Sequence, residues 1–217
     1  MSDTTRHDRL IGELAATLRP VRRLPPPWKR AAGWVVLVVA IGVGLLALAG
    51  SDVVRHRLAA NPDAWLAVLG SALTAPLAAY AAFQTSVPGR NPRWALLPVP
   101  AALLWVGASG FGCLRSWIAP PSRDAVEPRD CLVFIVCVSL PLAIALVLML
   151  RRACPLRPGL TATLGGLASA AAAATLLNLF HPFDVAATDL AIHAVAIALV
   201  VLATRALGAR ALGSRTT

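Results

Sequence analysis

The sequence predicts an all-α, polytopic membrane protein with six transmembrane helices, on the basis of its composition, six long apolar segments and the placement of its charges. Hydrophobic residues make up 58% of the 217 residues and charged residues only 14%. A transmembrane helix needs about 20 consecutive apolar residues, and only a helix satisfies the backbone of such a segment internally. The six predicted spans are Ala31–Gly50, Ala64–Thr85, Arg93–Trp117, Cys131–Leu150, Gly159–Phe180 and Ala186–Ala206.

The basic residues are sorted between the two sides of the membrane that six spans define. Fifteen of the 20 lysines and arginines fall on the side of the two termini, and from Asp52 onward every carboxylate falls on or near the other side. The positive-inside rule therefore predicts that both termini are cytoplasmic. A net charge of +10 would suggest nucleic-acid binding in a soluble protein. Here topology explains it, so we expect the lipid bilayer, and not nucleic acid, as a direct partner.

The chain divides into a cytoplasmic N-terminal segment (1–30), a membrane domain (31–207) and a cytoplasmic tail (208–217). We expect the first span to be retained, because a polar head precedes it and its apolar run is longer than the roughly 7–15 residues of a signal peptide. Within the head, a short amphipathic helix is predicted from Thr5 to Arg19. Its apolar face has helical spacing and consists of Leu10, Ile11, Leu14 and Leu18.

Two interpretations of this helix stand side by side. It could lie on anionic lipid, with Arg19, Arg22 and Arg23 near the headgroups. It could instead fold against a cytoplasmic partner and present its leucine stripe to a groove. On the opposite face, Arg9 and Glu13 are spaced for an i,i+4 ion pair.

The spans themselves carry mainly structural patterns. The fifth contains Gly165, Gly166 and the five alanines 170–174, and small residues let helices approach closely. We therefore expect it to be the central packing helix. We expect Cys137 to be buried in the fourth span. Five of the six tryptophans lie at predicted membrane boundaries, where the indole prefers to lie: Trp28, Trp34, Trp65, Trp94 and Trp117.

Candidate functional residues gather on the outer side. Cys113 and Cys131 flank the outer loop between spans three and four, where an oxidising compartment would permit a disulfide; they can equally be two ordinary small residues. Cys131, His181 and Asp184 offer mixed ligands for a thiophilic or borderline metal, although no close ligand spacing supports a site. Asp189 and His193 share a helix face, and intramembrane ionisable residues usually pair or line a functional cavity.

These residues leave two function classes open and one disfavoured. A small transporter or ion channel would use Asp189 and His193 as a proton or ion relay. A regulator would use the N-terminal segment to hold a partner. An enzyme is not expected, because the sequence contains no nucleophile–base pair, phosphate loop or close-spaced metal ligands. No resident cofactor is expected either.

The whole chain resembles the NrsF-like family of six-span membrane anti-sigma factors in proteobacteria. Three stretches carry the resemblance: Asp8–Ala15 with Leu18–Trp28, Cys131–Ile135 with Ser139–Pro141, and Leu179–Asp184 with the following His193. The resemblance implies a multi-pass protein of the bacterial inner membrane. It also implies that the N-terminal segment holds an extracytoplasmic-function (ECF) sigma factor in the cytoplasm through Leu10, Ile11, Leu14, Leu18, Arg19, Arg22 and Arg23.

The resemblance further implies that the outer side senses stress, such as a heavy metal or an oxidant. One of the family's two sensing cysteines corresponds to Cys131, whereas the other corresponds to His181. This departure argues against a simple two-cysteine switch. A Cys131–His181 pair could still bind a transient metal ion with Asp184, and Cys113 could serve as the thiol partner. His193 belongs to the same set of candidate sensing residues.

Overall fold

The computed structural model describes residues 3–17, 23–50, 52, 54–55, 62–118, 128–180 and 187–213, and it describes no side chain at 3–4, 62–64, 111–118, 128–132 or 187–193. Throughout the described residues the regular structure is helical. Five stretches whose side chains are described are long and apolar enough to cross a membrane. They are Pro27–Ala49, Trp65–Thr85, Val133–Ala153, Pro158–Phe180 and Ala194–Gly213, and they indicate a helical membrane protein.

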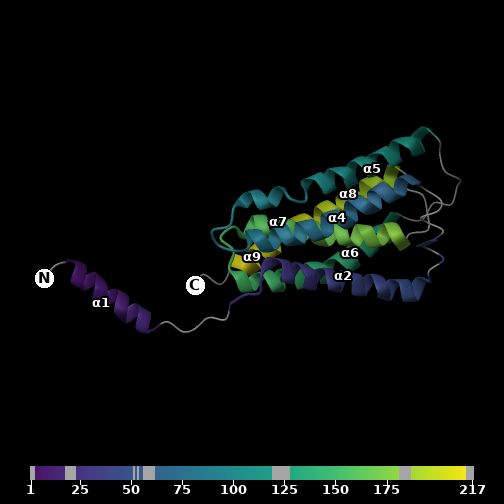
Figure 1. The fold of residues 1–217 in the computed structure, drawn as a ribbon. Coiled ribbons are helices and arrows are strands. Elements are labelled where there is room, and N and C mark those ends of the chain that lie inside the picture. Colours follow the sequence, from purple (N-terminus) through teal and green to yellow (C-terminus); the bar gives the residue numbers. More distant parts are fainter. Residues whose placement is uncertain are drawn as a thin grey trace.

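The helices form one bundle, with a short N-terminal helix beside it (Figure 1). The N-terminal helix is α1 (Asp3–Ala16). The long helices of the bundle are α2 (Pro27–Ala49), α4 (Pro62–Thr85), α5 (Val99–Ile118), α6 (Pro128–Leu150), α7 (Pro158–Phe180) and α8 (Ala187–Ala203). Short 3₁₀ helices precede α5 (η1, Pro92–Leu96) and follow α6 (η2, Arg151–Ala153), while α8 continues through the π-helix η3 (Thr204–Gly208) into α9 (Ala209–Gly213).

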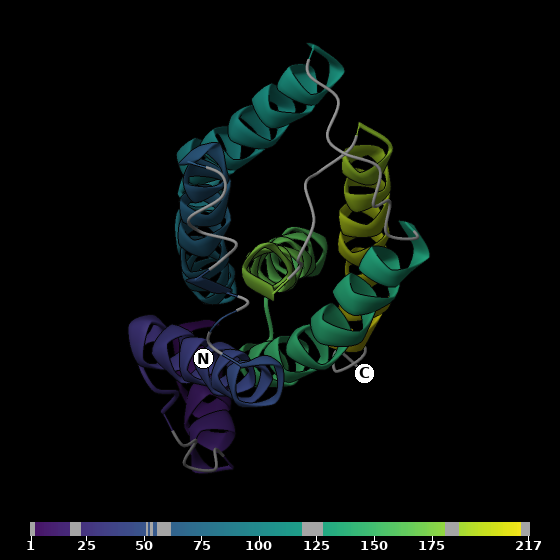
Figure 2. The same ribbon diagram turned by 90° about the vertical axis from the view of Figure 1, so that its right-hand side faces the viewer.

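Helix α7 occupies the centre of the bundle, and the other long helices surround it (Figure 2). It packs against α4, α6, α8 and α2, while α5 closes the ring by packing on α4 and α8. Its alanines and glycines are buried almost without exception. The small side chains allow these close approaches, so the prediction of a central packing helix is confirmed.

Hydroxyl groups join α7 to α4 along their shared interface. The Thr175 and Ser71 hydroxyl oxygens lie 2.9 Å apart, and the Thr85 and Thr161 hydroxyl oxygens lie 3.3 Å apart. Ser71, Thr85 and Thr161 are buried, and buried hydroxyls need hydrogen-bond partners. The Thr175 hydroxyl donates to the Ala171 carbonyl at 2.8 Å. These contacts fix the position of α4 relative to α7 along the helix axes.

Proline and glycine account for most differences from the predicted helix bounds. The predicted third span is divided into η1 and α5 around Pro98, which cannot donate a backbone hydrogen bond. The first span begins four residues early, because Pro27 is acceptable in the first turn of a helix. The sixth continues past Ala206 to Gly213, and Leu212 is buried in the core.

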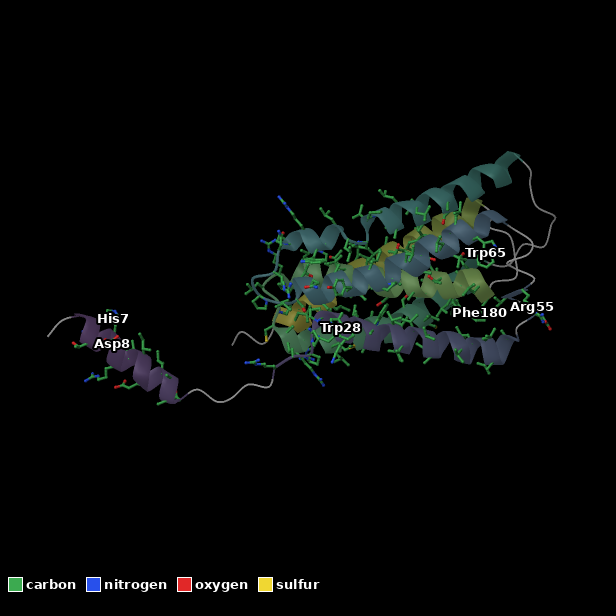
Figure 3. The ribbon with its side chains drawn as sticks, in the orientation of Figure 1. His7, Asp8, Trp28, Arg55, Trp65 and Phe180 are labelled. Carbon is green, nitrogen blue, oxygen red and sulfur yellow. The ribbon has the colours of Figure 1, made fainter. Side chains whose placement is uncertain are left out.

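Two side-chain expectations were wrong. Trp34 lies in the core with 1% of its surface exposed, not at the membrane boundary, because its indole N–H is bonded to a backbone carbonyl of α6. Cys137 is exposed on the surface of α6, since Ile135 and Ser139 occupy the buried positions on that part of the helix. Trp28 and Trp65 remain half-exposed, and Figure 3 places them toward opposite ends of the bundle.

Candidate functional site

The apolar face of α1 is exposed. Leu10, Ile11 and Leu14 are 53%, 63% and 58% exposed. Figure 1 shows α1 set apart from the long helices. The described part of the bundle therefore does not cover this face. A half-exposed apolar stripe at helical spacing is the form that a helix-in-groove contact requires.

Helix α1 ends earlier than the predicted Arg19. Both the backbone N–H and the hydroxyl of Thr17 donate to the Leu14 carbonyl, at 3.2 and 2.8 Å, and this tight turn ends the helix after Ala16. The predicted ion pair of Arg9 and Glu13 is confirmed, with 3.5 Å between the Nε of Arg9 and the Oε1 of Glu13. The other predicted partner-binding residues are Leu18, Arg19 and Arg22, which lie outside the described residues, and Arg23, which is exposed in the coil before α2.

Basic side chains converge at one end of the bundle. This end, which we call the basic end, is where α2, α5 and α7 begin and where α4, α6 and α9 finish (Figure 1). No described side chain of the bundle contributes a carboxylate there. Its basic residues are Lys29, Arg30, Arg90, Arg93, Arg151, Arg152, Arg157, Arg205 and Arg210.

Arg30 is the one buried residue in this set, with 7% of its surface exposed. Its guanidinium group donates to the Met149 carbonyl of α6 and lies 4.5 Å from the centre of the buried Phe83 ring of α4. The carbonyls of the last helical turn have no partner within their own helix, and a cation there also interacts favourably with the helix dipole. Arg30 therefore joins α2, α4 and α6 at a single point.

Trp34 makes a second contact between α2 and α6, one turn farther into the bundle. Its indole Nε1–H donates to the Leu142 carbonyl at 3.1 Å. Arg30 and Trp34 are about 6 Å apart along α2, and their acceptors are about 10 Å apart along α6; the long arginine side chain spans the difference. We call this pair of contacts the α2–α6 clamp. The clamp fixes the helix that follows the N-terminal segment to the helix that begins near Cys131.

Arg30, Phe83 and Trp34 were not predicted as functional candidates from the sequence. Arg30 was assigned to the polar head because it immediately precedes the apolar run. A basic residue at a span boundary is expected to extend toward the headgroups, and the pattern of one chain does not reveal that a neighbouring helix offers it a free carbonyl.

The predicted sensing residues lie mostly outside the described part of the chain. His181 and Asp184 belong to undescribed residues, and the side chains of Cys113, Cys131 and His193 are likewise undescribed. The backbone alone places Cys113 in α5, Cys131 in the first turn of α6 and His193 in α8. The ends of α5 and α7 and the starts of α6 and α8 lie opposite the basic end (Figure 1).

Figure 3 marks this opposite end by Phe180, Trp65 and Arg55. The Nη2 of Arg55 lies 2.7 Å from the Oδ1 of Asp52. A basic residue at this end therefore has a carboxylate beside it, unlike the described basic residues of the basic end. Among the described side chains, no three potential metal ligands form a group. The predicted ligands Cys131, His181 and Asp184 are not among those side chains, and neither is Asp189.

No curated protein and no solved structure matches the chain. A family model does match it, over residues 14–213, and its description is negative regulator of sigma F. The match covers the whole of the described bundle and the last residues of α1. A helical membrane bundle with an exposed N-terminal apolar helix and this match lead to one conclusion: the chain belongs to the NrsF family.

Proposed function

We propose that this protein is an integral-membrane anti-sigma factor of the bacterial inner membrane. Its N-terminal segment, residues 1–24, sequesters an ECF sigma factor in the cytoplasm and releases it when the opposite side of the membrane meets a stress signal, such as a heavy metal or an oxidant. Family membership supports a sigma factor as the partner. The single observation that carries the proposal is the exposed apolar stripe of α1, attached to the basic end of a membrane bundle.

The convergence of basic residues supports this orientation. The residues that the sequence assigned to separate cytoplasmic loops lie at one end of the bundle, and the Asp52–Arg55 pair lies at the other. Since lysine and arginine are retained on the cytoplasmic side, the basic end is the cytoplasmic end. With α5 counted as a span, six spans bring α1 and α9 to that same side, where a sigma factor is available.

The size of the α1 stripe suits reversible capture. Full burial of a leucine or isoleucine side chain contributes about 1.5–3 kcal/mol. Leu10, Ile11 and Leu14 still have about half of their surface to bury, so they would contribute about 3 kcal/mol together. This is more than a hundredfold in affinity, large enough to matter and small enough to be reversed.

The α2–α6 clamp supports a route for release. α6 starts with the turn that contains Cys131 and ends at Leu150, next to Met149, whose carbonyl accepts the Arg30 hydrogen bond; α2 leads back to the N-terminal segment. A tenfold loss of sigma affinity needs about 1.4 kcal/mol of difference between two states. Each hydrogen bond of the clamp is worth about 1 kcal/mol, so a signal that loosens it could supply that difference.

The test replaces Leu14 by Asp, with Ala16→Asp as the matched control. Ala16 lies about 200° round the helix from Leu14, so the control adds the same charge on the opposite face. A buried unpaired carboxylate costs at least about 2 kcal/mol, or about thirtyfold in affinity. We therefore expect Leu14→Asp to make a sigma-dependent reporter constitutive and to remove sigma from protein purified from native membranes.

The control variant should retain both repression and sigma binding. If Leu14→Asp represses as well as the unchanged protein while reaching the same level in the membrane, the stripe is not the sigma-binding surface. A transporter that used Asp189 and His193 would be indifferent to both substitutions. Deletion of residues 2–24 gives the stronger version: sigma should be recovered with the full chain and absent with the shortened one.

A further inference from the structure

Three arginines meet at the end of α6 and have no carboxylate among the described residues to neutralise them. Arg151 and Arg152 form η2, immediately after α6, and Arg30 reaches the same helix end from α2. Arg30 bonds the Met149 carbonyl, only two and three residues before Arg151 and Arg152, so three positive charges gather at this helix end, and like charges repel one another. We call these three residues the arginine cluster.

The Arg30 guanidinium group contacts the Met149 carbonyl and the Phe83 ring. Within the described part of the chain, the Arg151 guanidinium group lacks a hydrogen-bond acceptor for one of its nitrogens. The Nε of Arg151 is buried and makes no hydrogen bond to any described residue. A buried guanidinium nitrogen without an acceptor is costly, and the repulsion within the cluster adds to that cost. An anion at this place would remove both costs at once.

The surroundings indicate which anion is available. Leu148, one turn before Arg152, is half-exposed, as is Leu140 two turns earlier, so this part of α6 presents an apolar face outward. On α2, the exposed Trp28 ring lies 5.4 Å from the Lys29 ammonium group, an arrangement typical of the headgroup level. The arginine cluster therefore lies where a lipid-facing surface ends.

We propose that Arg151 and Arg152 bind the phosphate group of an anionic phospholipid, while Arg30 stays bonded to α6. Guanidinium groups bind phosphate through paired hydrogen bonds, and basic pockets between transmembrane helices on the cytoplasmic side accommodate anionic headgroups. This lipid site is distinct from the sigma-binding surface proposed above, because Arg151 and Arg152 follow α6 whereas that surface is the apolar face of α1.

The test is native mass spectrometry of the purified full chain in neutral detergent, titrated with phosphatidylglycerol. The double variant Arg151→Gln/Arg152→Gln is compared with Arg90→Gln/Arg93→Gln, which removes the same charge from the link between α4 and α5. A basic residue at an anionic surface contributes roughly fivefold in affinity. We therefore expect the first variant to weaken binding of the first lipid roughly thirtyfold and the second to leave it within about threefold.

Three further arms secure the assignment. Phosphatidylcholine should bind weakly to every form, and inorganic phosphate should not compete with the lipid. The charge-preserving variant Arg151→Lys/Arg152→Lys should recover the part of the binding that depends on charge alone, without the paired hydrogen bonds of the guanidinium groups, and also reports whether the region folds. Equal losses in the two glutamine variants would overturn the site, as would unchanged binding in the first. Full competition by inorganic phosphate would overturn the lipid as its ligand.

Discussion

Replacement of Gly70 by alanine tests the packing of α4 against α5 directly. A Cβ atom at Gly70 would lie 2.6 Å from the backbone nitrogen of Trp105 and 2.7 Å from its Cα. Ordinary contacts of such atoms begin at 3.4 Å. Since backbone atoms cannot rotate aside, the two helices would have to separate by about 0.8 Å at this point, and overpacking of this kind costs about 1–3 kcal/mol.

A matched control is needed because alanine also has a higher helix propensity than glycine, by about 1 kcal/mol. A Cβ atom at Gly107 in α5 would meet no described atom within 4 Å, so Gly107→Ala gains the propensity without the clash. Gly165 is intermediate, since its nearest neighbour, at 2.9 Å, is the methyl end of the Leu146 side chain, which can rotate away.

The assay is equilibrium unfolding of the purified protein in mixed micelles with increasing SDS. We expect the stability order Gly107→Ala, then Gly165→Ala, then Gly70→Ala, with about 1–3 kcal/mol between the first and the last. The comparison of alanine variants cancels the propensity gain. If Gly70→Ala were as stable as Gly107→Ala, α4 and α5 would not approach as closely as the structure requires.

Three other predictions concern the clamp, the orientation and the sensing residue. Trp34→Phe removes the indole donor to the Leu142 carbonyl and part of a buried ring, so it should lower the free energy of unfolding by about 2 kcal/mol. Val36→Ala, at an exposed position of the same helix, should change the same SDS unfolding curve much less. Cys154 is exposed in the turn after η2. A variant that retains it as the single cysteine should therefore react with a membrane-impermeant maleimide in inverted vesicles but not in intact spheroplasts. The reverse pattern would contradict a cytoplasmic basic end. Cys131→Ser should blunt reporter induction by cadmium or an oxidant while basal repression persists, and a full response would exclude Cys131 from sensing.

The sequence predicted the helical membrane architecture because each span must satisfy its own backbone in lipid, which makes length and apolarity sufficient signs of a helix. It also predicted the central place of α7, because small residues let neighbouring helices approach closely. The apolar face of α1 could also be recognised, since it depends on spacing within one short segment.

Helix bounds were less predictable where local chemistry competes with hydropathy. Pro98 divides the predicted third span, and the Thr17 turn shortens α1. Neither effect changes the average apolarity of its segment. The sixth helix passes beyond its predicted end because its last turns, including Leu212, pack into the core, and such packing compensates for the charges beside them.

The amino-acid sequence alone indicates which segments are long and apolar enough to cross a membrane and which loops hold the positive charges, because both depend on the transfer of individual residues between water and lipid. The packing of the helices was needed to show that Arg30 and Trp34 are buried contacts between α2 and α6, and that the Nε of Arg151 is left without an acceptor among the described residues. Those outcomes depend on which backbone carbonyl a neighbouring helix presents at the crossing, and this follows from how helices far apart in the sequence pack.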